Sequence, residues 1–149
     1  MSKIIIELIT AGLGSVAFGL IFNVKKKYLP VTFGLGLLCW VAWLYFGSLI
    51  GDNLFITSLF TGLAMAIAAE IISRVLRAPS TIFFLTATIP IIPGGPLYHC
   101  MVSIVEGNQE MASSYGRATL FIALGISVGM SIAWAICDLS RKIRKRING

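Results

Sequence analysis

Long apolar runs separated by short polar segments make up almost the whole chain. The runs cover residues 4–22, 29–49, 54–72, 81–105 and 114–137. Each is long enough to cross a bilayer as an α-helix, because the hydrocarbon core is about 30 Å thick and takes roughly 20 helical residues. The pattern predicts an all-α integral membrane protein of one domain, residues 1–149, with five transmembrane helices and a basic cytoplasmic tail at residues 138–149.

The fourth run contains a segment that cannot form a regular α-helix. Pro93-Gly94-Gly95-Pro96 lies at its middle, and Pro90 comes one turn earlier. Each proline removes a backbone N–H donor and clashes with the preceding turn, and glycine has little helical preference. We therefore expect the fourth transmembrane helix to be broken at these four residues.

The break leaves two half-helices, residues 81–89 and 97–105, each roughly 13 Å long and so about half the hydrocarbon thickness. We expect it near the membrane midplane, where non-helical backbone occurs only if protein buries it or it lines a wet cavity. Discontinuous helices of this kind are typical of transporters. The alternative is a proline kink that packs against neighbouring helices and contacts no ligand.

The second half-helix suggests a ligand. Pro96 suits its first position, and the free N–H groups and dipole of a helix N-terminus favour an anion such as a carboxylate. The carbonyl groups that end the first half-helix suit a cation or an ammonium group. Tyr98 contacts substrate or anchors the half-helix; His99 contacts substrate or a proton, or is a hydrogen-bonded interior residue. The candidate substrate-binding residues are Pro93, Gly94, Gly95, Pro96, Tyr98 and His99.

One carboxylate falls on a face of small residues in the third run. Gly62, Ala66, Glu70 and Arg74 follow one another at four-residue spacing, which places them on one side of a helix. A charged carboxylate in hydrocarbon costs roughly 2.5–3.5 kcal/mol. Glu70 is therefore either a structural partner of Arg74 or a proton-coupling carboxylate that faces a cavity. Glu7 lies nearer the outer surface and is a weaker candidate.

Small residues at four-residue spacing predict surfaces where helices pack closely. They occur in the first, third and last runs. The predicted helix-packing residues are Ala11, Ser15, Gly19, Gly62, Ala66, Gly125, Gly129 and Ala133.

Composition and charge agree with a membrane protein. The chain is 57% hydrophobic and 12% charged, with a mean hydropathy of +0.90. A soluble domain of 149 residues has too little interior to bury this much apolar surface.

The net charge of +6 comes mainly from three basic clusters between or after the apolar runs, at residues 25–27, at Arg74 and Arg77, and at residues 141–146. Basic residues concentrate on the cytoplasmic side of membrane proteins. Five crossings then predict an external N-terminus and a cytoplasmic C-terminus in the cell inner membrane. The tail also suits anionic lipid, and the placement of the charges argues against nucleic-acid binding.

The sequence contains no pattern of an enzyme or a metal protein. Its three cysteines are scattered, no metal-ligand spacing occurs, and no nucleophile–base pair or phosphate-binding loop is present. We expect no metal and no cofactor, and we expect a protein that is not an enzyme.

Several stretches resemble the threonine/serine exporter family, specifically its shorter, five-span half. They are Ala78-Pro79-Ser80-Thr81, Ile89-Pro90-Ile91-Ile92-Pro93-Gly94-Gly95-Pro96-Leu97-Tyr98, Glu106-Gly107-Asn108, Ser114-Tyr115-Gly116 and Phe22-Asn23-Val24. The family often has a small residue where this chain has Pro96. The resemblance implies export of small carboxylate solutes, threonine and serine in the founding members. It also implies a hetero-oligomer, because short subunits that resemble this chain work with a larger subunit of the same family. Some such pairs are associated with succinate export.

Two functional hypotheses remain after the sequence analysis. The first is a subunit of a secondary exporter, in which the broken helix binds the substrate and Glu70 couples transport to protons. The second is an accessory subunit that only scaffolds a partner, so that its break is structural. Substrate flux after a change in the break, with assembly monitored, separates the two.

Overall fold

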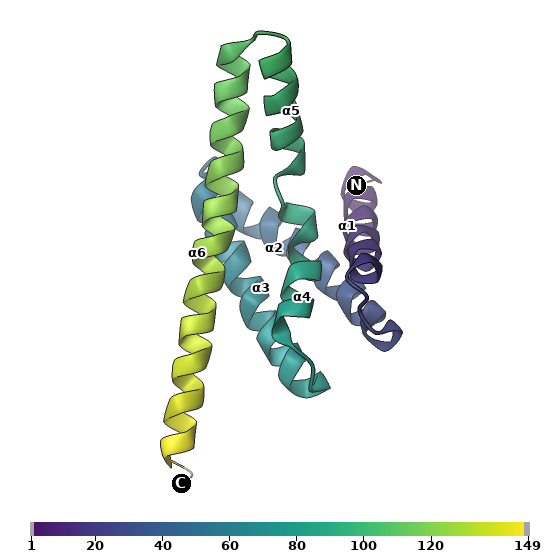
Figure 1. The fold of residues 1–149 in the computed structure, drawn as a ribbon, viewed down its shortest axis with the longest axis vertical. Helices are drawn as coiled ribbons and strands as arrows, with labels where there is room; N and C mark the ends of the chain where they lie inside the picture. The colour runs from purple at the N-terminus through teal and green to yellow at the C-terminus, as the bar shows by residue number, and fades with distance from the viewer. Residues whose placement is uncertain (1, 148–149) are drawn as a thin grey trace.

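The chain folds into α-helices of very different length. The computed structural model describes residues 2–147, and no strand occurs in that range. The elements in order are α1 (Ser2–Ile21), η1 (Lys26–Tyr28), α2 (Leu29–Ile50), α3 (Leu54–Leu76), α4 (Ser80–Thr88), η2 (Ile89–Ile91), α5 (Gly94–Val105) and α6 (Gln109–Ile147), where η marks a 3-10 helix (Figure 1).

Within residues 2–147, four helices are long and apolar enough to cross a membrane, and a bent pair would make five if it crosses as one span. The bent pair is Ser80–Ile91 with Gly94–Val105, which meet at an angle of 53°. The prediction of an all-α membrane protein is therefore confirmed, and the helical segment is interrupted between Ile91 and Gly94, where the prolines predicted a break.

The break differs in detail from the expectation. α5 begins at Gly94, with Pro93 immediately before it, so Pro96 lies inside the first helical turn instead of opening it. A helix tolerates proline there because N–H groups of its first turn have no acceptor within the helix. On the other side, Pro90 stands in the 3-10 helix η2, which tightens the end of α4.

α6 is longer than its predicted span of 114–137 at both ends. It starts at Gln109 because the Asn108 side chain accepts a hydrogen bond from the Met111 N–H (3.2 Å), a typical N-cap contact. At the other end the helix runs through the basic tail to Ile147, and Asp138 and Lys142 form an i, i+4 ion pair of 2.9 Å there. At 39 residues α6 is about 58 Å long, well over the hydrocarbon thickness.

α3 and α6 form the most extensive helix pair in the molecule, and they run parallel. A Cβ added at Gly125 would lie 2.5 Å from the Phe55 carbonyl oxygen, and one at Gly129 would overlap the Leu59 carbonyl oxygen. Gly62 lies against the Ile126 backbone in the same way. These glycines let the two backbones approach closely.

α4 packs between α1, α2 and α3 and carries much of the core. Phe83 and Phe84 are buried, and the Tyr28 ring meets the Phe83 ring edge-on at 5.5 Å between centroids. α2 packs on α1 where Gly36 contacts Ser15. The core residues are Leu35, Cys39, Met65, Ala66, Ala69, Phe83, Phe84, Ala87, Ile91 and Ala133.

The segments that carry the three basic clusters lie toward one end of the molecule. The Tyr28 hydroxyl donates to the Leu76 carbonyl (3.4 Å), which brings the loop between α1 and α2 beside the C-terminal end of α3. Because α6 runs parallel to α3, its C-terminal part lies at the same end (Figure 1).

α5 forms a hairpin with the first turns of α6, at the other end of the molecule (Figure 1). The Cys100 thiol donates to the Ala112 carbonyl (3.3 Å), and the His99 and Tyr115 rings lie 5.2 Å apart. Gly125, nine residues after Gly116 and so about 14 Å further along α6, lies against the backbone of α3. The segment from Ser80 to Val105 therefore runs from the basic end to the opposite end, as a fourth crossing requires.

Candidate transport site

A pocket of about 280 Å³ lies where η2 meets α1 and α2, and we call it the η2 pocket. It combines apolar and small residues with one carboxylate, one hydroxyl and one indole. Its lining residues are Glu7, Thr10, Ala11, Gly14, Trp40, Ile89 and Pro90. Trp40 lies midway along α2, so the N-terminal side of the break is beside the middle of that helix. The position of the break relative to the bilayer midplane stays a prediction.

The polar groups of the η2 pocket retain unused hydrogen-bonding capacity. The Trp40 indole N–H is buried and donates to no acceptor among residues 2–147. The Thr10 hydroxyl donates to the carbonyls of Ile6 and Glu7, both at 2.9 Å, which leaves its oxygen able to accept. An indole N–H that finds no acceptor at membrane depth is costly, so a ligand acceptor near Trp40 would be favoured.

Sequence reasoning missed Trp40 and Thr10 as site residues and ranked Glu7 low. A signal was present in the first helix, because Glu7, Thr10, Ala11 and Gly14 follow the i, i+3, i+4, i+7 spacing of one helix face. Nothing local marks Trp40, which reaches the site only because α2 packs against α1.

The predicted substrate-binding residues lie on the other side of the break. Gly94 and Gly95 are exposed, and a Cβ added at either would meet no atom within 4 Å. The N-terminus of α5 offers fewer donors than expected. Pro93 and Pro96 have no N–H, and the Gly94 N–H donates to the Ile92 carbonyl at 2.7 Å. Gly95 is left with the one free N–H of this turn among the described residues.

Tyr98 and His99 form an aromatic group with Tyr115 of α6. The Tyr98 and His99 rings meet edge-on at 5.5 Å, and the His99 and Tyr115 rings lie 5.2 Å apart at an angle of 30°. Tyr98 and His99 are exposed, and neither lines the η2 pocket. The structure therefore brings Tyr98 and His99 together with α6 and leaves them apart from Glu7 and Trp40.

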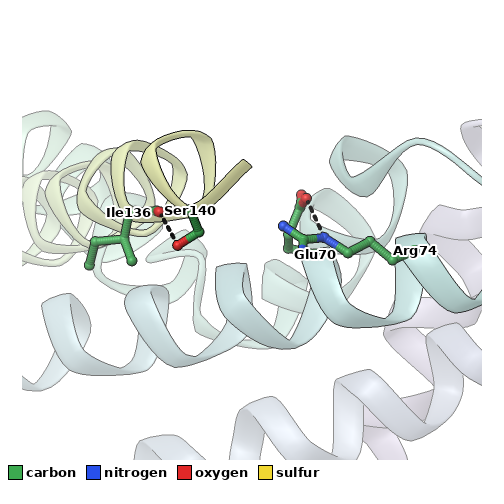
Figure 2. Close-up of polar contacts among 4 residues, drawn as sticks. All are labelled: Glu70, Arg74, Ile136 and Ser140. Carbon is green, nitrogen blue, oxygen red and sulfur yellow. Dashed lines mark hydrogen bonds and ion pairs between the residues drawn. The ribbon is translucent and has the colours of Figure 1, made fainter. Parts of the chain in front are cut away.

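A second pocket, of about 290 Å³, lies at the start of α4, and we call it the Glu70 pocket. Its lining residues are Glu70, Ser80, Thr81, Trp134, Cys137 and Asp138. The Glu70 side chain is 4% exposed and accepts a hydrogen bond from Arg74 Nε at 3.2 Å, whereas the Arg74 side chain is 46% exposed (Figure 2). The predicted pairing of Glu70 with Arg74 is thus present, and Glu70 also lines a cavity.

The two pockets lie at opposite ends of the helical segment that α4 and η2 form. From Ser80 in the Glu70 pocket to Pro90 in the η2 pocket the helical rise is about 15 Å. Phe83 and Phe84, which lie between these positions on α4, are buried. The hydroxyls of Thr86 and Thr88 donate to carbonyls within the same helical segment, so they add no unpaired polar group. The two pockets therefore lie at the two ends of this helical segment, and each contains at least one carboxylate.

No group of three His, Cys, Asp or Glu side chains that suits a metal ion occurs within the part of the chain that the structure describes.

Comparison with known proteins identifies the family of the chain. The family model described as "Threonine/Serine exporter, ThrE" matches residues 7–136. No curated protein and no solved structure matches the chain. The match covers both pockets except Cys137 and Asp138, together with the broken helix. The chain therefore belongs to the threonine/serine exporter family and is a multi-pass membrane transporter of that type, which is not an enzyme class.

Proposed function

We propose that this chain is one subunit of a secondary exporter of small carboxylate solutes, coupled to the proton gradient. The solutes are amino acids of the threonine/serine type or a dicarboxylate such as succinate. The larger subunit is a member of the same family, and the complex is a hetero-oligomer of the cell inner membrane.

The observation that carries the proposal is the pair of pockets at the two ends of the helical segment formed by α4 and η2. A transporter needs a site reached from each side and a barrier between them, and the broken helix supplies the part that can move. Here Phe83 and Phe84 are the barrier, and η2 with Pro93 is the flexible point. Exposed Tyr98 and His99 line the route beyond the break.

Glu70 is the proposed proton-coupling residue. It is buried, it lines a pocket, and it contacts an arginine that is itself half exposed. Movement of Arg74 would change the charge balance around Glu70 without unfolding α3. Buried acidic residues in membrane helices commonly serve proton relays.

The orientation follows from charge. The segments with the basic clusters lie toward one end, and basic residues favour the cytoplasmic side. We therefore propose that the Glu70 pocket faces the cytoplasm and that the N-terminus and residues 106–110 are external. Anionic lipid then meets the basic tail.

The partner is proposed from what the helices leave uncovered. In the most apolar stretch of α3, 44% of the residues are buried within the chain. In the corresponding stretches of α2 and α6, only 17% and 22% are buried. Paired halves are common in transporters, so lipid and a second subunit together would cover α1, α2 and α6.

Reconstitution in liposomes tests the proposal. Efflux of labelled threonine, serine and succinate is measured for this chain alone, for the larger subunit alone and for both, with and without a pH gradient. We expect efflux only with both subunits and only with the gradient. Full efflux by this chain alone rejects the partner, and normal efflux after disruption of the break in an assembled complex supports the scaffold alternative.

A further inference from the structure

We propose that the η2 pocket is a binding site for a small molecule that carries a primary ammonium group next to a hydrogen-bond acceptor, with Glu7 as the counter-ion. The inference rests on the proposed exporter function and deepens it, because it chooses between the two solute classes. Amino acids fit this site, and dicarboxylates do not.

The charge of the pocket is the first reason. Glu7 is its one charged lining residue, and it forms no ion pair within residues 2–147. Glu7 is exposed, at the open side of the pocket. A carboxylate attracts an ammonium group and repels a second carboxylate. The pocket is therefore selective for a cationic group at the Glu7 wall.

Hydrogen bonding is the second reason. Trp40 supplies an indole N–H with no protein acceptor, and this donor suits a carboxylate or hydroxyl oxygen. Thr10 lies one turn from Glu7 on the same face of α1, and its oxygen can accept from an ammonium or hydroxyl group. A ligand with an ammonium group at Glu7 and an acceptor near Trp40 would pair with both the Glu7 carboxylate and the Trp40 indole N–H.

The size of the pocket is the third reason. At about 280 Å³ it is at or below the lower end of the range for drug-sized ligands, so it suits a small solute. Ala11 and Gly14 are small residues in the α1 wall, and Ile89 and Pro90 line the pocket from η2. Because Pro90 belongs to the broken helix, a ligand here contacts the segment expected to move.

Trp40 provides a direct probe of the site. The chain has three tryptophans, so Trp43→Phe with Trp134→Phe leaves Trp40 as the sole indole. Its emission is titrated in the full-length protein, purified in detergent, with four probes: L-threonine, ethanolamine, 3-hydroxybutyrate and succinate. 3-Hydroxybutyrate is threonine without the ammonium group, and ethanolamine lacks the carboxylate.

We expect threonine and ethanolamine to change the Trp40 emission and the two acids to change it at ten-fold higher concentration or not at all. Glu7→Gln should raise the Kd for threonine and ethanolamine at least ten-fold. Glu106→Gln removes an exposed carboxylate outside the pocket and should leave both values unchanged. A Glu7→Gln variant that elutes as a folded protein but binds within two-fold of the parent overturns the site. Succinate binding as tight as threonine binding overturns it as well.

The efflux assay distinguishes a failure of the proposed binding site from a failure of the proposed exporter function. If the reconstituted pair exports nothing while Trp40 still reports Glu7-dependent binding, the site stands and the exporter proposal fails. If the pair exports normally and Glu7→Gln changes neither binding nor efflux, the exporter stands and the site fails. Glu7→Gln that alters the response to pH but leaves every Kd unchanged also overturns the ammonium site.

Discussion

The packing of α3 against α6 should depend on Gly129 having no side chain. In Gly129→Ala the new Cβ would overlap the Leu59 carbonyl oxygen and lie 2.8 Å from the Leu63 backbone N. Both neighbours are backbone atoms, so neither can rotate away. The helices would have to separate by about 1 Å to reach ordinary contact distance, and a gap of that size loses a quarter to a half of each dispersion contact along the pair.

The matched control for Gly129→Ala is Gly34→Ala in α2, where an added Cβ meets nothing within 4 Å. Both changes gain the same helix preference, about 0.8–1.0 kcal/mol, so the difference in their unfolding free energies isolates the packing term. Overpacking costs about 1–3 kcal/mol, which corresponds to a roughly 5- to 160-fold difference in the ratio of folded to unfolded protein.

Unfolding in mixed detergent and dodecyl sulfate micelles, followed by the loss of helical circular dichroism, measures this difference. We expect Gly34→Ala to be neutral or stabilising by up to about 1 kcal/mol and Gly129→Ala to be less stable than Gly34→Ala. Equal stability of the two variants, within about 0.5 kcal/mol, would refute the close α3–α6 contact as an element of stability.

Three further predictions concern transport and topology. Glu70→Gln should preserve the amount of folded protein and lower proton-coupled efflux at least ten-fold; a lower protein level with normal efflux per folded molecule would mean that Glu70 only pairs with Arg74. Leu at both Gly94 and Gly95 should leave insertion intact, because open space surrounds both positions, and should reduce efflux sharply, whereas wild-type efflux from an assembled complex would contradict a substrate route at the break. A cysteine at Asn108 should react with an impermeant reagent from outside only, and labelling from the cytoplasmic side alone would reverse the proposed topology.

The sequence by itself was enough to predict the class of the protein and the break in its fourth helix. Both are local properties. Apolar runs of about 20 residues are stable in lipid whatever their neighbours, and Pro90, Pro93 and Pro96 interrupt helical hydrogen bonding in any surroundings. The pairing of Glu70 with Arg74 was predictable for the same reason, because residues four apart on a helix are always neighbours.

The limits of the helices were harder to predict than their existence. α5 starts at Gly94 because the orphan N–H positions of a first turn accept Pro96, and α6 starts at Gln109 because Asn108 caps it. These choices depend on small free-energy differences between helix and loop, which composition alone does not resolve.

Only the tertiary structure decided where polar groups meet. Glu7, Trp40 and Pro90 lie on three different segments, more than 30 residues apart in sequence, and they share a pocket because α1, α2 and η2 pack together. Likewise, Glu70 and Ser80 share a pocket with Trp134 because α6 runs parallel to α3 along a seam of glycines. Packing of this kind depends on shape complementarity between distant surfaces, and no periodicity within a single helix contains that information.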